Sequence, residues 1–206
     1  ASFFERRVHY IDRQPPAAAA VARAAELLKG RKRPLLIAGG GALYASAMKE
    51  VRQFAEAFGI PVAETQSGKG VLPWNHPLNV GAIGVTGTLA ANRLAGGADV
   101  IIGVGTRYSD FTTASKSAFA RPGVRFVNIN VNAMDASKWG GAALIGDAKA
   151  GLGALSAALA EADYRSAYEP GEIEGLRRRW HEEVDRWYSA ERSEGMAQTR
   201  ALGIIQ

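Results

Sequence analysis

The residues best suited to bind a phosphate group lie between Thr65 and Gly87, where Gly68, Lys69 and Gly70 stand in a glycine-rich segment. A lysine between glycines could offer an ammonium group and accessible backbone N–H groups to an anion. The P-loop of nucleotide hydrolases, however, requires Ser or Thr directly after its lysine to bind Mg²⁺. Because Gly70 follows Lys69 here, we expect no P-loop and no ATP hydrolysis of that type.

Two further glycine clusters follow apolar runs, at 39–41 and at 103–105. Glycines between a strand and a helix let a ligand approach the backbone, and a helix N-terminus favours anions. The dinucleotide fingerprint G-x-G-x-x-G would require glycine at the position that Tyr44 occupies. A nucleotide site and a pair of tight turns without a ligand therefore both remain open at this point.

No nucleophile, base and orienting group are grouped in the sequence. Histidines and aspartates are scattered, without metal-ligand spacing: His9, His76, His181, Asp110, Asp135 and Asp147. Asp147 directly follows Gly146 and suits the N-cap of a helix. The chain has no cysteine, which excludes thiolate chemistry and cysteine-bound zinc. We therefore expect no catalytic residue and no metal ligand in this chain.

The elements that must position these residues alternate between strands and helices. The uninterrupted apolar runs 34–38 and 100–104 are typical of strands buried on both faces of a parallel sheet. Further strands are predicted at 60–65, 124–131 and 142–147, and helices at 16–29, 45–59, 86–94 and 148–162. The pattern predicts an α/β, doubly wound (Rossmann-like) parallel sheet of about six strands flanked by helices, with the two apolar strands adjacent at its centre.

Composition narrows the function classes further. The 206 residues carry a net charge of +5, and the basic triplets at 31–33 and 177–179 lie far apart without an aromatic-rich basic sheet. We therefore expect no nucleic-acid partner. No apolar run reaches the length of a membrane span, so we expect no membrane partner and a cytoplasmic protein.

The ordered motifs from Gly39 onward resemble the central domain of thiamine-diphosphate enzymes of the acetohydroxyacid synthase type. The matching segments are "GGG", "GIPVAET", "GKGVLPWNHPLNVGAIGVTGTLAANRLAGGADVIIGVGTRYSDF" and "RFVNINVN". Within that family, "RRVHYIDRQPP", "ETQSGKG" and "NINVNAMDASK" are most similar to hydrolases of inositol catabolism that cleave a carbon–carbon bond in a cyclic diketone. The resemblance implies a three-domain enzyme whose outer domains bind thiamine diphosphate and Mg²⁺.

The resemblance also implies a division of the chain into three parts. Residues 1–15 are expected to be an arm or linker, 16–162 the central domain, and 163–206 a linker, a charged helix and the truncated start of the next domain. We expect a piece of a longer protein whose partners are its flanking thiamine-diphosphate-binding domains, in a homodimer or homotetramer. Leu176, Trp180, Val184 and Trp187 form an apolar stripe on the charged helix.

In flavin-bearing relatives FAD lies across this sheet, which assigns candidate cofactor-binding positions by resemblance. The candidates are Gly39, Gly40, Gly41, Thr65, Gln66, Gly87, Thr106, Arg107, Asp110, Asn130 and Asn132, with Ser67, Gly84–Thr86, Gly105, Gly146 and Asp147 at other matching positions. Asn130 and Asn132 replace the usual acidic residues, and Phe111 replaces a basic one. Because carboxylates that accept nucleotide hydroxyls are missing, we expect no FAD and a crevice without a cofactor.

Two other functions remain open. The chain could be a stand-alone nucleotide-binding module with NAD or FAD in the crevice, or a fragment of a carboligase of the acetolactate synthase type. The substrate itself cannot be derived from this segment, because the resemblance places the substrate-contacting loops in the outer domains.

Overall fold

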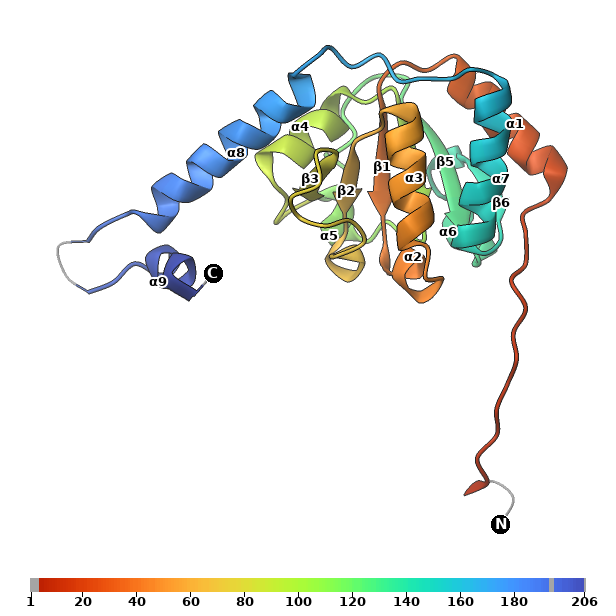
Figure 1. The fold of residues 1–206 in the computed structure, drawn as a ribbon, viewed down its shortest axis with the longest axis horizontal. Coiled ribbons are helices and arrows are strands. Elements are labelled where there is room, and N and C mark those ends of the chain that lie inside the picture. Colours follow the sequence, from red (N-terminus) through yellow and green to blue (C-terminus); the bar gives the residue numbers. More distant parts are fainter. Residues whose placement is uncertain (1–3, 193–194, 206) are drawn as a thin grey trace.

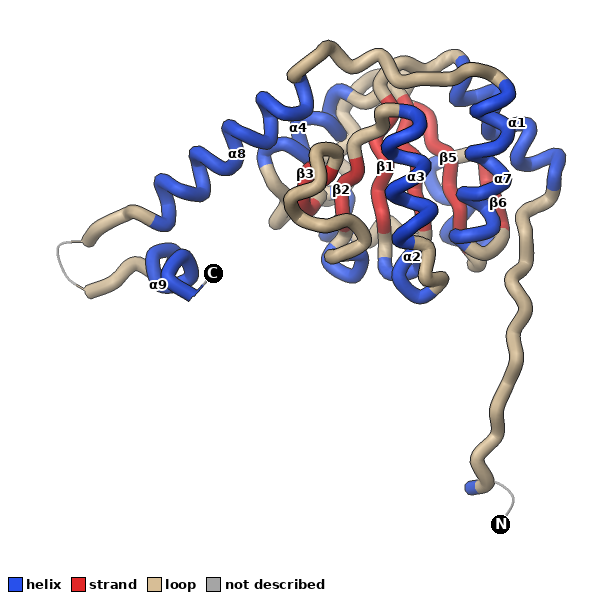
Figure 2. The backbone as a smooth tube through the Cα atoms, in the orientation of Figure 1, coloured by secondary structure: helices blue, strands red, loops and turns tan. Residues whose placement is uncertain are grey.

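The computed structural model describes residues 4–192 and 195–205, and its centre is a six-stranded, all-parallel sheet (Figures 1 and 2). The strand order is β3-β2-β1-β4-β5-β6. The strands are β1 (Pro34–Ala38), β2 (Val62–Glu64), β3 (Asn79–Ala82), β4 (Val100–Val104), β5 (Arg125–Asn130) and β6 (Ala142–Ile145). This is the predicted doubly wound α/β fold.

The two apolar strands lie side by side at the centre of the sheet, as predicted. β1 pairs with β4 in parallel, with Pro34 opposite Val100 and Ala38 opposite Val104. Every residue of both strands is buried. The absence of a polar residue in either run follows from this position, because helices cover both faces of a parallel sheet.

Helices divide the apolar core between the two faces of the sheet. They are α1 (Ala18–Lys29), α2 (Gly40–Tyr44), α3 (Met48–Phe58), α4 (Leu89–Gly97), α5 (Asp110–Thr113), α6 (Ala133–Ala136), α7 (Ala148–Glu161), α8 (Glu172–Tyr188) and α9 (Gln198–Ile205). One core joins α1, α3 and α7 to residues such as Leu36 and Ile102. The other joins α4 to Leu35 and Ile101, which point to the opposite face because strand side chains alternate.

The predicted element boundaries move where capping decides them. The helix expected from residue 86 begins at Leu89, because the Thr88 hydroxyl accepts a hydrogen bond from the Ala91 N–H (3.0 Å) and so caps it. Asp147 caps α7 as predicted, its carboxylate accepting from the Ala150 N–H at 3.0 Å.

The outer strand β3 was not predicted as a strand and lies inside the segment interpreted as one long loop. Val80 is its one strongly apolar residue, and Gly81 has a φ of +83°. Because an edge strand has one neighbour and a partly exposed face, it needs no continuous apolar run, so the sequence pattern that revealed β1 and β4 is absent here.

The segment after α7 crosses the amino edge of the sheet in contact with the domain. The Ser166 and Ala167 N–H groups donate to the carbonyls of Phe58 (2.9 Å) and Lys32 (2.7 Å), and the Tyr168 hydroxyl donates to Pro34 O at 2.8 Å. Residues 163–171 are thereby held against the ends of the central strands, and α8 starts from a fixed position.

The helix α8 packs its first half on α4 and then extends away from the domain, with α9 beside its far end (Figure 1). Along the predicted apolar stripe, Leu176 is buried, Trp180 and Val184 are half-buried, and Trp187 is 42% exposed. The rings of Trp180 and Trp187 meet edge to face, 5.6 Å apart. The stripe therefore packs on the domain at its start and faces solvent at its end.

Candidate functional site

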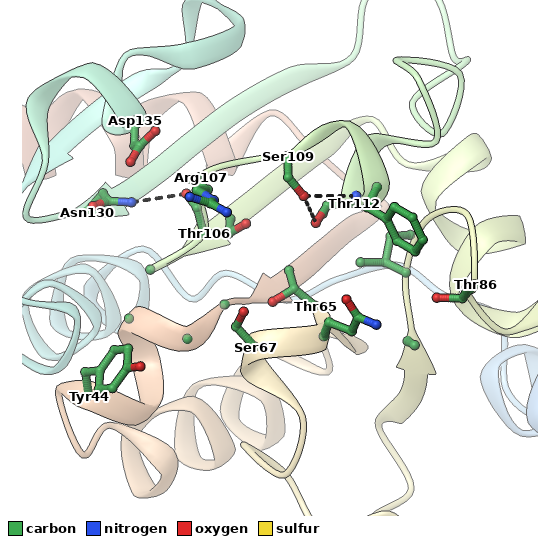
Figure 3. Close-up of a pocket in the computed structure, with 18 residues that line it drawn as sticks. Tyr44, Thr65, Ser67, Thr86, Thr106, Arg107, Ser109, Thr112, Asn130 and Asp135 are labelled. Atoms are coloured by element: carbon green, nitrogen blue, oxygen red, sulfur yellow. Dashed lines mark hydrogen bonds between the residues drawn. The ribbon is translucent and has the colours of Figure 1, made fainter.

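A crevice of about 360 Å³ opens at the carboxyl ends of the central strands (Figure 3). It lies where the strand order reverses between β1 and β4, which is the ligand-binding position of open α/β sheets. Its volume falls at the lower end of the range of small-molecule sites. The fold therefore provides the place for a ligand, and the lining residues decide which chemistry is available there.

Most of the predicted site residues meet in this crevice. Its lining includes Gly39, Gly40, Gly41, Thr65, Gln66, Thr106, Arg107 and Asn130. Three other predicted residues lie outside the lining. Gly87 forms the turn before α4, Asp110 accepts a hydrogen bond from the Ser115 hydroxyl at 3.0 Å, and Asn132 caps α6 by accepting from the Met134 N–H at 2.9 Å.

The glycine turns after β1 and β4 pack directly against each other. The Gly39 and Gly41 N–H groups donate to the carbonyls of Val104 (2.8 Å) and Gly105 (3.0 Å). A Cβ atom on Gly39 would lie 2.3 Å from Gly105 O, closer than real atoms approach. Two of the N–H groups that could have bound an anion therefore donate to protein carbonyls instead. The close contact between the two backbones explains why glycine is required here.

The Gly-Lys-Gly loop is organised around a carboxylate. The Glu64 Oε1 atom accepts hydrogen bonds from the N–H groups of Gly70 (3.2 Å) and Leu72 (3.1 Å), and the Glu64 residue is only 7% exposed. Just before the turn, the Thr65 hydroxyl accepts from the Gly68 N–H at 3.1 Å. The loop amides that would cradle a phosphate in a P-loop therefore bind protein oxygens here, in agreement with the expectation that this is no P-loop.

Burial raises the pKa of Glu64 above its ordinary value of 4.5, against the opposing effect of the Leu72 and Gly70 hydrogen bonds. An acid with a raised folded-state pKa keeps its proton longer in the folded state. The free energy of unfolding therefore falls as pH rises from 4.5 through the folded-state pKa of Glu64. The loss is about 1.4 kcal/mol for each tenfold difference in proton affinity between the folded and unfolded states.

Glu64→Gln is expected to remove this pH dependence, because the amide is neutral at every pH while its oxygen still accepts the loop N–H groups. Urea unfolding of both proteins at a series of pH values from 4 to 8 gives the difference in unfolding free energy. That difference should grow in favour of the variant as pH rises. Glu161→Gln, at an exposed position, is the control and should show no such trend. Parallel curves for wild type and Glu64→Gln would contradict the prediction.

The Asn130 side chain connects β5 to the turn after β4. Its Nδ2 atom donates to Thr106 O at 3.1 Å, and its Oδ1 atom accepts from the Asn132 N–H at 3.0 Å (Figure 3 shows the first of these bonds). An ionised aspartate could accept from Asn132 but could not donate to Thr106. The amide at this position therefore has a structural reason that is independent of any ligand.

Arg107 is the one exposed cation among the crevice-lining residues, and it makes no ion pair with any described residue. Lys138 lies nearby, pairs with Asp135 at 2.7 Å and donates to Arg107 O at 2.5 Å. The Asp135 carboxylate is thus neutralised by Lys138, and the Arg107 guanidinium remains available for a phosphate or carboxylate at the crevice mouth.

Several lining residues were not among the predicted site residues. They are Tyr44, Ala82, Ile83, Ser109, Thr112, Asp135 and the departure Phe111. Ser109 could have been found from its N-cap position before α5, where its hydroxyl accepts from the Thr112 N–H at 3.4 Å. Tyr44 and Ile83 lie in the crevice only because α2 and the end of β3 adjoin it, and no sequence signal marks that.

The histidines form no catalytic group. His76 is buried in the loop, where its Nε2 atom lies 3.0 Å from Glu56 Oε1 and its Nδ1 atom accepts from the Leu78 N–H. His9 and His181 are exposed, and neither lines the crevice. In the described parts of the chain, no three His, Asp or Glu side chains are grouped to hold a metal ion.

Fold and crevice together define a doubly wound α/β domain of the type that binds ligands at its switch point. The family described as thiamine pyrophosphate enzyme, central domain, matches residues 21–155. The chain therefore belongs to the thiamine pyrophosphate (thiamine diphosphate) enzymes and carries their central domain.

Within the described residues, no helix has both the length and the apolar character that spanning a bilayer requires.

The chain is also similar to proteins named 3D-(3,5/4)-trihydroxycyclohexane-1,2-dione hydrolase. It is 47% identical over 187 residues to that of Bacillus cereus (strain AH820), which covers 91% of this chain and 29% of the relative. It is 45% identical over 192 residues to that of Clostridium tetani (strain Massachusetts / E88), covering 93% and 30%. The chain thus spans about three-tenths of these relatives' length. With 187 of 206 residues aligned, the similarity extends past the family match into α8.

Proposed function

We propose that the chain is the central domain of a thiamine-diphosphate-dependent hydrolase that cleaves a carbon–carbon bond of a trihydroxycyclohexane-dione in inositol catabolism. The observation that carries this proposal is 47% identity over 91% of the chain to a hydrolase of that name, with α8 included. A carboligase of the acetolactate synthase type would share the family match but is not favoured by this longer similarity.

The described residues do not suit Mg²⁺, because no three His, Asp or Glu side chains among them are grouped to hold a metal ion. We therefore assign both cofactors to flanking domains of a longer, cytoplasmic protein that forms a homodimer or homotetramer. Residues 16–162 act as the structural middle domain, 1–15 as an arm and 163–206 as the connection onward. None of the reaction steps is assigned to this chain.

A chimeric enzyme tests the proposal directly. The aligned segment of the Bacillus cereus hydrolase is replaced by this chain, and hydrolysis of the dione is measured. We expect activity within about tenfold of the parent, since a domain that only positions its neighbours needs matching surfaces and no catalytic group. The central domain of a carboligase of the family, inserted at the same place, is the control and should restore less activity. Equal activity from both insertions would contradict the assignment to the hydrolase.

The isolated chain is expected to bind neither thiamine diphosphate nor flavin. Calorimetry with thiamine diphosphate and Mg²⁺ should show no binding in the micromolar range. The visible spectrum should lack a flavin band with or without added FAD, because the Asn130 amide is engaged with Thr106 and Asn132. Micromolar, Mg²⁺-dependent binding, or a flavin band that stays with the protein through gel filtration, would refute these expectations.

A nucleotide-binding module is the second candidate function, and the available guanidinium of Arg107 beside the glycine turns is the observation that favours it. A phosphate at the crevice mouth would find a cation there. Absorbance of a nucleotide released when the purified chain is denatured would support this function. If no nucleotide is released and the chimera is active, the structural role of a middle domain is the function that stands.

A further inference from the structure

A second groove, of about 390 Å³, adjoins the crevice and shares Thr65, Gln66 and Ala82 with its lining. Its walls are the Gly-Lys-Gly loop, the outer strand β3 and the helix α8. β3 is the edge strand of the sheet, and Thr88 covers part of its backbone: the Thr88 hydroxyl donates to Val80 O, and the Thr88 N–H donates to Ala82 O at 2.8 Å. The groove is therefore defined mainly by side chains from distant segments of the chain.

Tryptophans contribute the apolar part of this groove. Trp74 from the loop is 78% exposed, and Trp180 from α8 is half-buried. An exposed indole combines a flat apolar face with one N–H donor, which suits a ligand that is apolar on one face and polar at its rim. The C–H face of a saturated six-membered ring has this character.

Polar side chains of both kinds surround the tryptophans. Glu64 supplies a carboxylate whose Oε1 atom already accepts from the Gly70 and Leu72 N–H groups, while Lys69 and Arg177 only donate. His181 adds an imidazole that can do either. Each hydroxyl of a polyol is a donor and an acceptor at once, so a ring with several hydroxyls can bind donors such as Lys69 and Arg177 together with the His181 imidazole.

The charges in the groove favour a neutral ligand over an anion. The two cations Lys69 and Arg177 would attract a phosphate, but Glu64 lines the same groove and is 7% exposed, so a bound anion would meet a poorly screened carboxylate. A neutral hydroxylated ring avoids this repulsion and still gains charge-assisted hydrogen bonds.

We propose that this groove binds a neutral polyhydroxylated ring, a sugar or a cyclitol, between Trp74 and Trp180. The ligand class follows from the lining residues and stands whether or not the hydrolase function holds. The site would be non-catalytic, since none of its groups is paired as nucleophile and base. Its position beside the crevice would couple ligand binding to the Thr65–Gln66 segment that the two cavities share.

The test is a titration of the 206-residue chain with myo-inositol, followed by tryptophan fluorescence and by saturation-transfer NMR of the ligand. We expect saturable binding in the low millimolar range, which is usual for a small polar ligand in an open site. Trp74→Ala should weaken binding at least about tenfold, and His181→Ala about threefold. Both residues are exposed, so neither change disturbs the core.

Trp187→Ala is the matched control, because Trp187 contacts Trp180 but does not line this groove. It should leave the binding constant within about twofold of wild type. Three results would overturn the proposal: no saturable signal with myo-inositol, equal losses in Trp74→Ala and Trp187→Ala, or tighter binding of inorganic phosphate than of myo-inositol. None of these results bears on the activity of the chimeric hydrolase, so the two proposals fail independently.

Discussion

Replacing Gly105 with alanine is expected to lower the free energy of unfolding by roughly 2–5 kcal/mol, the sum of a backbone and a packing cost. Gly105 has a φ of +61°, in the left-handed region that costs an L-residue about 1–2 kcal/mol. Its added Cβ would also lie 2.5 Å from Ala42 N and 2.6 Å from Gly41 Cα. Both neighbours are backbone atoms that cannot rotate away, so the two glycine turns would have to separate.

Urea unfolding followed by circular dichroism measures this loss. Gly153→Ala is the matched control, because Gly153 is exposed within α7 and its Cβ would meet nothing within 4 Å. That change should stabilise the protein by about 0.5–1 kcal/mol through helix propensity. A loss below about 1 kcal/mol in Gly105→Ala would show that the turns can separate cheaply, and the close-packing explanation of the crevice glycines would then be wrong.

Asn130→Asp is expected to cost about 1–3 kcal/mol at neutral pH, since it leaves the buried Thr106 carbonyl without its donor. The new carboxylate would face that carbonyl oxygen, which adds repulsion to the lost bond. Because a protonated carboxyl can donate, we expect the folded-state pKa of the new aspartate to be raised. The penalty should therefore be small in acid and appear as pH rises above the unfolded-state value of about 3.9.

The measurement is the unfolding free energy of Asn130→Asp and wild type between pH 4 and 8, with FAD binding tested on the same samples. Asn132→Asp is the control, because the Asn132 side chain accepts from Met134 N–H and Asp135 N–H and a carboxylate accepts equally well at a helix start. It should be nearly neutral. A stable Asn130→Asp variant at pH 8 would contradict the structural role given to the amide.

The central part of the fold could be predicted because the amino-acid composition of its strands indicates whether they are buried. β1 and β4 are buried on both faces, and only apolar residues satisfy that position, so both strands and their adjacency followed from the sequence. The sequence of β3 carries no such signal, since an edge strand tolerates residues such as Asn79 and Gly81. Helix starts were displaced where a capping side chain such as Thr88 decided the boundary, which a periodicity argument does not resolve.

The candidate site was predictable where backbone geometry defines it and unpredictable where side chains choose partners. Glycines at the ends of β1 and β4 had to meet once the two strands were adjacent. The engagement of Glu64 with the Gly-Lys-Gly loop could not be anticipated, because two residues six positions apart meet only through the course of that loop. The sequence shows Asn130 where related domains carry an acidic residue, but it does not show why. The hydrogen-bond partner of Asn130, the Thr106 carbonyl, lies after a different strand.

The anchoring of the arm at Asp147 determines where the central domain begins in space. Arg13 pairs with the Asp147 carboxylate at 2.7 Å, and the Asp147 N–H donates to Gln14 O at 2.8 Å, so the chain enters at the carboxyl edge beside the first turn of α7. The helix α7 ends at Glu161, and from there the chain continues along the amino edge of the sheet toward α8. The 14 residues of α7 separate the anchored arm from this edge by about 21 Å.

The helix α7 therefore acts as a rigid spacer between the two edges of the sheet. A circular permutant that joins Gln14 directly to Ala162 would need a linker of at least about six extended residues to span it.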